Sequence, residues 1–251
     1  MARHQQDDFQ AEKAVVRAFH DALDRSTPAT IVAEMEAFVA PEWHWRGMHP
    51  FHEQRGAEAV ARVFWTPLRH ALKPLQRRPD IFIAGRNEID DGASVWVVEM
   101  GHLMGLFDRP WLGIRHTLRI AMLRYCEFNK VENGRITETA MFCDIPHLMI
   151  QAGQNPFPPQ TGAMLVQPGP RTHTGLCWDK QDPARGEAAM AAINAMLRGM
   201  GERTKDEDPA WRLAQTWHDD MLWWGPAGIG ATYTIERYLR QHSRPFGKAL
   251  S

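Results

Sequence analysis

The chain has 251 residues, with 29 Lys and Arg against 30 Asp and Glu, a formal net charge of −1 and 44% hydrophobic residues. A nearly neutral chain lacks the charge that draws proteins to nucleic acid or anionic membranes, and no apolar run nears the roughly 20 residues that span a bilayer. We therefore expect a globular protein with no nucleic acid and no membrane partner. The N-terminus has no apolar segment after its basic residues, which predicts a cytoplasmic location.

The first part of the chain has the spacing of amphipathic helices. Apolar residues recur at helical intervals through 10–25 and again through 31–38, and Thr27-Pro28 predicts the start of the second helix. A third helical pattern covers 60–68, and we expect it to end before Pro74.

Beyond Pro79 the pattern becomes that of β-strands. The expected strands are 81–83, 95–98, 118–128 and 135–142. The strongest turn signal is Asn133-Gly134, which predicts a hairpin between the last two strands. Helices followed by an antiparallel meander define the α+β class and exclude alternating βαβ units.

A stretch rich in proline and glycine, 155–186, predicts a linker or wrapping arm between a domain at 1–154 and a segment at 187–251. The last segment repeats the order of the first helices, with Trp45-Arg46-Gly47-Met48 corresponding in place to Trp224-Gly225-Pro226-Ala227. The strands of a second copy are missing. We therefore expect an incomplete repeat that packs on the first domain, pairs with another chain or is the remnant of a truncated reading frame.

The order of these elements resembles that of the SnoaL-like polyketide cyclases, which have the nuclear-transport-factor-2-like cone fold. In this chain Asn133-Gly134-Arg135-Ile136-Thr137-Glu138 leads through a strand to Asp144 and a short helix that ends near Gly153. Gly101-His102-Leu103-Met104-Gly105, followed by Leu112-Gly113-Ile114, is similar to the family's Gly-x-His-x-Gly segment and the turn after it. The resemblance implies helices packed on a curved antiparallel sheet over residues 10–153, with the helical part of a second copy over 187–251.

The resemblance also implies an acid–base site. By family position Asp144 is the general base and His102 the donor for an intramolecular aldol closure, in which a proton α to a carbonyl is removed and the enolate attacks a second carbonyl. The position of Asp144 before a helix with proline in its first turn equally predicts an N-cap. His102 equally fits a hydrogen-bonded histidine in a half-buried sheet.

The 10 Trp and 13 Met residues predict either an apolar ligand pocket or ordinary core packing. The side chains that we expect to bind substrate are His49, His52, Trp45, Trp96, Phe64 and His116. His44, His49 and His52 lack the spacing of a zinc-binding helix, so we expect no metal and place them at a pocket mouth or in a solvated loop.

Together these features predict a cofactor-independent cyclase or isomerase that acts on a small hydrophobic, polyketide-like carbonyl compound. The alternative is a non-catalytic module of the same fold that binds a hydrophobic ligand or dimerises, and departures such as Thr139-Ala140 in place of His-Trp favour it. We expect a homodimer, because domains of this fold often pair through the convex face of the sheet. Three widely spaced cysteines predict reduced, structural thiols.

Overall fold

The computed structural model describes residues 8–164, 172–201 and 209–249, which form two units. The sheet unit comprises Asp7–Pro156 and Gly169–Lys180, and the C-terminal unit comprises Phe157–Pro168 and Gln181–Ser251. The stretch rich in proline and glycine is therefore divided between the two units. Within the described ranges no helix is long and apolar enough to cross a membrane, and the three cysteines form no disulfide.

The sheet unit begins with the helix α1 (Gln10–Arg25), which has the predicted bounds. The second helix, α2 (Ile31–Glu36), starts later than the Thr27-Pro28 pattern predicts. The carbonyl of Thr27 instead accepts hydrogen bonds from the amides of Thr30 and Ile31, so the chain first makes a turn.

A continuous helical segment follows, made of α3 (Gly56–Val60), the π-helical turn η1 (Ala61–Trp65) and α4 (Thr66–Ala71). The strand β3 (Leu72–Arg86) begins at once, so Pro74 and Pro79 lie inside a strand and do not separate it from the helix. The helix does end before Pro74, as predicted, but the strand starts earlier than the predicted 81–83. Proline is tolerated there because β3 is an edge strand, where a missing N–H donor need not break the ladder.

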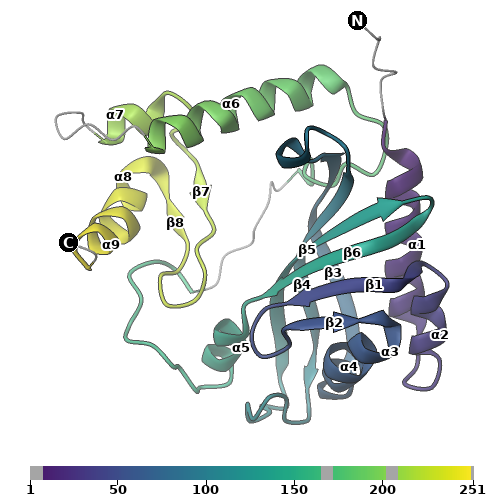
Figure 1. The fold of residues 1–251 in the computed structure, drawn as a ribbon. Coiled ribbons are helices and arrows are strands. Elements are labelled where there is room, and N and C mark those ends of the chain that lie inside the picture. Colours follow the sequence, from purple (N-terminus) through teal and green to yellow (C-terminus); the bar gives the residue numbers. More distant parts are fainter. Residues whose placement is uncertain (1–7, 165–171, 202–208, 250–251) are drawn as a thin grey trace, which may run out of the picture. The chain divides into compact units, whose positions relative to one another are not determined.

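The sheet has six strands in the order β2-β1-β6-β5-β4-β3 (Figure 1). Besides β3, they are β1 (Val39–Gly47), β2 (Glu53–Arg55), β4 (Val95–Phe107), β5 (Ile120–Glu132) and β6 (Arg135–Cys143). The meander β3-β4-β5-β6 is antiparallel, as predicted, but β1 pairs parallel with β6, so the sheet as a whole is mixed. Asn133 and Gly134 both have positive φ, which is the conformation that a tight hairpin turn requires.

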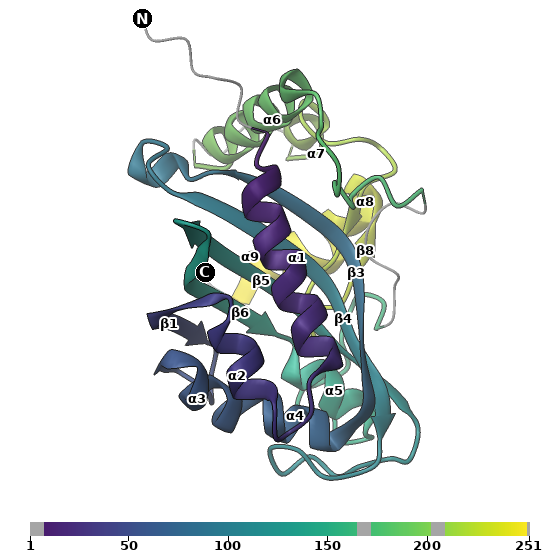
Figure 2. The ribbon, with the colours of Figure 1, turned by 90° about the vertical axis from the view of Figure 1, so that its right-hand side faces the viewer.

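The helix α1 lies across one face of the sheet (Figure 2). Its residues Val16, Phe19 and Leu23 are buried there. The sheet edge at β3 is covered by a later segment: the amide of Phe82 donates to Gly175, the amide of Cys177 donates to Phe82, and the ring of Trp178 packs on that of Phe82. Pairing of this kind protects an edge strand from association with other chains.

The last helix of the sheet unit is α5 (Ile145–Gln151). As the sequence predicts, Asp144 is its N-cap, with the carboxylate accepting from the amide of His147 at 3.0 Å. The side chain of Gln151 bonds the backbone of Met122, so α5 is fastened to β5.

The C-terminal unit is mainly helical, with one two-stranded sheet among its described residues. Its elements are α6 (Pro183–Gly201), α7 (Pro209–Ala214), β7 (Leu222–Trp223), β8 (Thr232–Tyr233), α8 (Thr234–Tyr238), the π-helical turn η3 (Leu239–Ser243) and α9 (Arg244–Ala249). Apolar residues at helical spacing from Trp211 to Met221 predict a longer helix, but α7 stops at Ala214 because the chain turns there to enter the β7-β8 hairpin.

Candidate active site

A cluster of charged side chains lies inside the sheet unit, between α1 and the sheet. His20 of α1 places Nε2 2.6 Å from Oε2 of Glu127 on β5, and Nδ1 3.3 Å from Oε2 of Glu99 on β4. All three side chains are 5% exposed or less. Glu99 and Glu127 are cross-strand partners, so one face of the sheet presents both carboxylates to a single imidazole.

Arg77 of β3 completes this buried charge cluster, which we define as His20, Arg77, Glu99, Tyr125 and Glu127. Its Nη1 lies 3.0 Å from Oε1 of Glu99 and 3.9 Å from Oε2 of Glu127. The hydroxyl of Tyr125 donates to the same Glu99 oxygen at 2.5 Å. Glu99 is therefore held by three side chains, whereas Glu127 has its closest ion pair with His20.

The environment fixes the charge states of the cluster. Burial and the charge of Arg77 lower the pKa of His20, but the two carboxylates and the hydrogen bond to Glu127 outweigh them and raise it to about 9. Burial raises the pKa of Glu99, but His20, Arg77 and the hydrogen bonds outweigh it and hold it well below its ordinary range. Burial and the neighbouring Glu99 raise the pKa of Tyr125. At neutral pH His20 and Arg77 are therefore cations, Glu99 is a carboxylate and Tyr125 remains a donor.

The interior around this cluster is aromatic. Trp45, Phe51, Phe64 and Trp111 form a contiguous group, with ring centroids 5.6 Å apart for Trp45 and Phe64 and 5.9 Å apart for Phe51 and Trp111. Trp65 joins it to the charge cluster, because its ring lies 5.0 Å from that of Phe64 and 5.6 Å from Cζ of Arg77.

Several N–H donors of this interior are buried without a hydrogen-bond partner in the described part of the sheet unit. They are Nε1 of Trp45, Nε1 of Trp65, Nε1 of Trp111, Nη2 of Arg77 and Nδ2 of Asn129. A buried donor without an acceptor costs about 1–3 kcal/mol, so most buried polar groups in proteins are paired. These donors could serve a ligand that brings acceptor oxygens.

The predicted pair of Asp144 and His102 lies elsewhere. Successive strand residues point to opposite faces, so His102 and Arg124 lie on the face opposite Glu99 and Tyr125. The carboxylate of Asp144 pairs with Nη1 of Arg124 at 3.1 Å, and His102 Nδ1 lies 3.7 Å from Asp80. Burial and the charges of Arg124 and His147 lower the pKa of His102 to about 4, so it is neutral at physiological pH.

Of the residues expected to bind substrate, the structure brings Trp45 and Phe64 into the buried aromatic interior. Trp96 lies on the His102 face, where its indole donates to Ser94. His49 and His52 pack on each other but are exposed, and so is His116, so none of these three faces the charge cluster. The residues described by the structure hold no group of His, Cys, Asp and Glu fit for a metal ion.

The sequence interpretation missed the charge cluster itself. Its signal was present in the strand alternation: Val97, Glu99 and Leu103 share one parity in β4, and Leu123, Tyr125 and Glu127 share one in β5. A glutamate among buried apolar positions of the same parity indicates a buried charge that needs partners.

Helices packed on one face of a strongly curved, mostly antiparallel sheet define an α+β cone with its candidate site inside. Residues 16–139 match the SnoaL-like domain family. The sheet unit of this chain is therefore a SnoaL-like domain, with the nuclear-transport-factor-2-like fold.

Several solved structures are similar to this chain, and the similarity covers almost all of their own length. A candidate SnoaL-like polyketide cyclase from Jannaschia sp. CCS1 is 16% identical over 63% of this chain and 100% of its own, with a TM-score of 0.46. IdmH from Streptomyces antibioticus, a candidate polyketide cyclase, is 14% identical over 56% and 96%, with a TM-score of 0.45. An NTF2-like protein from Burkholderia thailandensis E264 is 23% identical over 57% and 96%, with a TM-score of 0.41. Comparison with curated proteins gave no match.

Proposed function

We propose that the sheet unit is a cofactor-independent enzyme of the cyclase or isomerase type, which removes a proton α to a carbonyl of a small hydrophobic compound. The observation that carries this proposal is the imidazole of His20, held between Glu99 and Glu127 inside the cone. Perturbed pKa values arranged around a specific charge partner are a feature of acid–base sites.

The roles of the two carboxylates differ because their partners differ. Glu99 is fixed by Arg77, Tyr125 and His20, which stabilise its charged form and make it a poor base. We assign Glu127 as the general base and the His20 imidazolium as the cation that faces the developing enolate. Arg77, Glu99 and Tyr125 act through these two groups and position them.

The surrounding side chains suit a flat, apolar substrate with acceptor oxygens. The rings of Trp45, Phe64 and Trp65 supply apolar surface. The unpaired N–H groups of Trp65 and Arg77 would donate hydrogen bonds to a carbonyl or enolate oxygen of the substrate. A groove of about 520 Å³ is lined by residues of α2, α3, η1 and α4, and the buried residues Ile31 and Ala61 are part of its lining.

The predicted pair of Asp144 and His102 stands as the rival acid–base centre. His102 is neutral at physiological pH, but Asp144 already serves two partners, the amide of His147 and the guanidinium of Arg124. Asp144 is therefore engaged by a backbone amide and a guanidinium, whereas the shortest contact of Glu127 is with the His20 imidazole.

A non-catalytic ligand-binding module is the second candidate function. The observation that favours it is the near-complete burial of the charge cluster, whose members pair with one another.

Proton NMR in deuterium oxide, with acetophenone and 2-acetylnaphthalene as probes, separates the enzyme from the ligand-binding module. We expect the full-length protein to incorporate deuterium at the methyl group of the probes faster than buffer does. Saturable binding without exchange would support the ligand-binding module instead. If the protein shows no binding and no exchange, both candidate functions are contradicted.

A further inference from the structure

The face of β5 that α1 covers carries polar side chains in a row. Tyr125, Glu127 and Asn129 alternate with half-buried residues that point to the other face, and Asn129 is 0% exposed. Side chains two positions apart on a strand lie about 7 Å apart on the same face. Glu127 therefore stands between Tyr125 and Asn129 along this row.

A chain of hydrogen bonds fixes the side-chain amide of Asn129. The indole Nε1 of Trp43 donates to Oγ1 of Thr139 at 2.9 Å, and the same hydroxyl donates to Oδ1 of Asn129 at 2.7 Å. Because an indole can only donate, Thr139 accepts from Trp43 and gives its single proton to Asn129. The network therefore decides which branch of the amide is the oxygen and which is the nitrogen.

The nitrogen of this amide points away from its hydrogen-bonded oxygen. Asn129 on β5 and Thr139 on β6 are cross-strand partners, so Oδ1 faces β6 and Nδ2, on the other branch, faces away from β6. Among the described residues no acceptor bonds Nδ2, although the side chain is completely buried. A buried donor without an acceptor is unfavourable, and most buried polar groups in proteins are paired.

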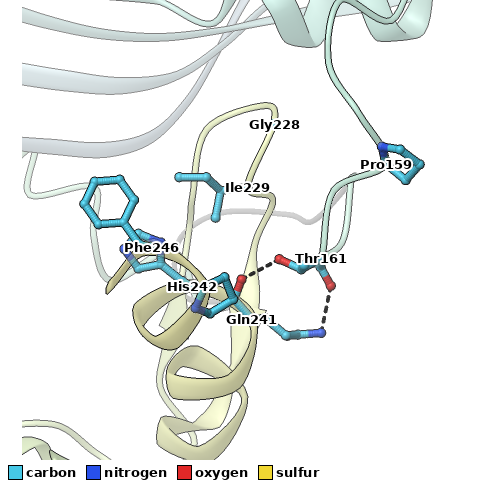
Figure 3. Close-up of a pocket in the computed structure, with 8 residues that line it drawn as sticks. Pro159, Thr161, Gly228, Ile229, Gln241, His242 and Phe246 are labelled. Atoms are coloured by element: carbon cyan, nitrogen blue, oxygen red, sulfur yellow. Dashed lines mark hydrogen bonds between the residues drawn. The ribbon is translucent and has the colours of Figure 1, made fainter. Parts of the chain in front are cut away.

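A side-chain amide of the C-terminal unit shows the more usual arrangement. Gln241 borders a pocket of about 240 Å³, and its Nε2 donates to the carbonyl of Thr161 at 2.9 Å (Figure 3). Gln241 is only half-buried, yet its amide nitrogen has an acceptor within its own unit. The unpaired Nδ2 of Asn129 is thus a feature of the interior of the cone.

A second unpaired donor lies on the opposite side of Glu127. Cζ of Arg77 is 5.4 Å from the ring centroid of Tyr125, and Nη1 of Arg77 is 3.9 Å from Oε2 of Glu127. Nη2 of the same guanidinium is buried without an acceptor among the described residues. Fixed N–H donors therefore flank Glu127, with Arg77 on the Tyr125 side and Asn129 on the other.

We propose that Nδ2 of Asn129 binds a second oxygen of the substrate, which has acceptor oxygens on both sides of the carbon that loses its proton. This assignment rests on the function proposed above, and it places one oxygen at Arg77, the other at Asn129 and the C–H group at Glu127. β-Diketones and β-keto esters have this arrangement. The proton passes to the carboxylate of Glu127, and the electron pair of the C–H bond spreads over the two oxygens, each facing an N–H donor.

Trp43 and Thr139 have a different role from Asn129. They bond Oδ1 and not the substrate, so they are positioning residues that hold Nδ2 in its direction. A protein without the Thr139 hydroxyl would leave the amide of Asn129 free to rotate. The preference for a second oxygen should therefore depend on Thr139 as well as on Asn129.

Binding of two matched ketones to the full-length protein, measured by isothermal titration calorimetry, tests the proposal. 2-Naphthoylacetone and 2-butyronaphthone share the ring and the carbon chain and differ in the second carbonyl oxygen. We expect the preference for the diketone to be about tenfold larger in the unaltered protein than in Asn129→Leu. Thr139→Val should lose most of this preference, whereas Thr139→Ser keeps the hydroxyl and should retain it.

A matched control lies on the same strand as Thr139. Thr137→Val removes a hydroxyl that donates to Glu132 at 2.7 Å, and it should leave the preference unchanged. Circular dichroism confirms that each variant is folded, and the Thr139 variants decide the question if Asn129→Leu is not. Deuterium exchange of 2-acetylnaphthalene, which has one carbonyl, tests the proposed enzyme separately.

Three results would overturn the proposal. The first is a preference for the diketone in folded Asn129→Leu, or in Thr139→Val, as large as in the unaltered protein. The second is a loss in Thr137→Val or Thr139→Ser equal to that in Thr139→Val. The third is an unaltered protein that does not bind 2-naphthoylacetone.

Discussion

Nε2 of His20 lies 2.6 Å from Oε2 of Glu127, in the interior of the sheet unit and remote from bulk water. The two residues are 107 positions apart in sequence, and only the packing of α1 on β5 brings them together. A buried, charge-assisted contact of this length stabilises the imidazolium form of His20.

Removing the charge of Glu127 should lower the pKa of His20. In Glu127→Gln the imidazolium loses its shortest contact, so we expect its pKa to fall from about 9 towards or below the ordinary value near 6.5. Titration of the imidazole signals by NMR measures the change. The control Glu53→Gln removes an exposed carboxylate that pairs with His44, and it should leave the pKa of His20 as it was.

The two buried histidines should give the stability opposite pH dependences. The raised pKa of His20 adds stability that is present below pH 6.5 and is lost as the pH rises through about 9. The lowered pKa of His102 adds stability that is present above pH 6.5 and is lost as the pH falls towards about 4. Urea unfolding across this range should show that His20→Gln flattens the alkaline loss and His102→Gln the acid loss; an unchanged slope in either variant would contradict the assignment.

Arg77→Met should be among the most destabilising substitutions in the sheet unit. It leaves Glu99 buried beside one cation in place of two, and breaking a buried ion pair from one side costs about 3–5 kcal/mol. Arg46→Met breaks the more exposed pair with Glu138 and should cost less than about 1 kcal/mol. Equal losses in the free energy of unfolding would argue against a buried ion-pair network.

Two substitutions at Asp144 should separate its capping role from its ion pair. Asp144→Asn keeps an oxygen that accepts from the amide of His147 but loses the charge that pairs with Arg124, whereas Asp144→Ala loses both. We expect the alanine variant to be less stable than the asparagine variant by about 1 kcal/mol, the usual value of an N-cap. Chemical denaturation measures the difference, and no difference would mean that the cap adds nothing to stability.

Gly47 and Gly225 each follow a tryptophan by two positions, and they should respond alike in the two units. A Cβ at Gly47 would collide with the ring of Trp45, and one at Gly225 with the ring of Trp223 and the carbonyl of Gly230. Overpacking of this kind costs about 1–3 kcal/mol. Hydrogen exchange should show faster exchange near β1 and β2 in Gly47→Ala and near β7 and β8 in Gly225→Ala. Exchange that changes in only one of the two variants would count against the equivalence of the two segments.

The meander, the Asn133-Gly134 hairpin and the cap at Asp144 could be predicted because each depends on local sequence. The parallel pairing of β1 with β6 could not, because it joins segments about a hundred residues apart and leaves no periodic mark. Pro74 and Pro79 misled the prediction of β3, because proline is compatible with an edge strand and the sequence does not say which strand is at the edge.

The candidate site was harder to predict than the fold. The resemblance selected His102 and Asp144, but strand parity places His102 on the face away from α1. Glu99 and Glu127 carry no motif, and their significance appears only when α1 brings His20 between them. Parity within β4 and β5 was the available signal, and it distinguishes the two faces without saying which face the helices cover.

The central claim is that Glu127 is the general base, and deuterium exchange at the methyl group of 2-acetylnaphthalene tests it most directly. Glu127→Gln should reduce the exchange rate by about 10²–10⁴-fold, the usual contribution of general acid–base catalysis, while Asp144→Asn should leave it near that of the unaltered protein. Circular dichroism confirms that both variants are folded. If Asp144→Asn abolishes exchange and Glu127→Gln preserves it, the acid–base centre is the His102–Asp144 pair and the account given for the buried cluster is wrong.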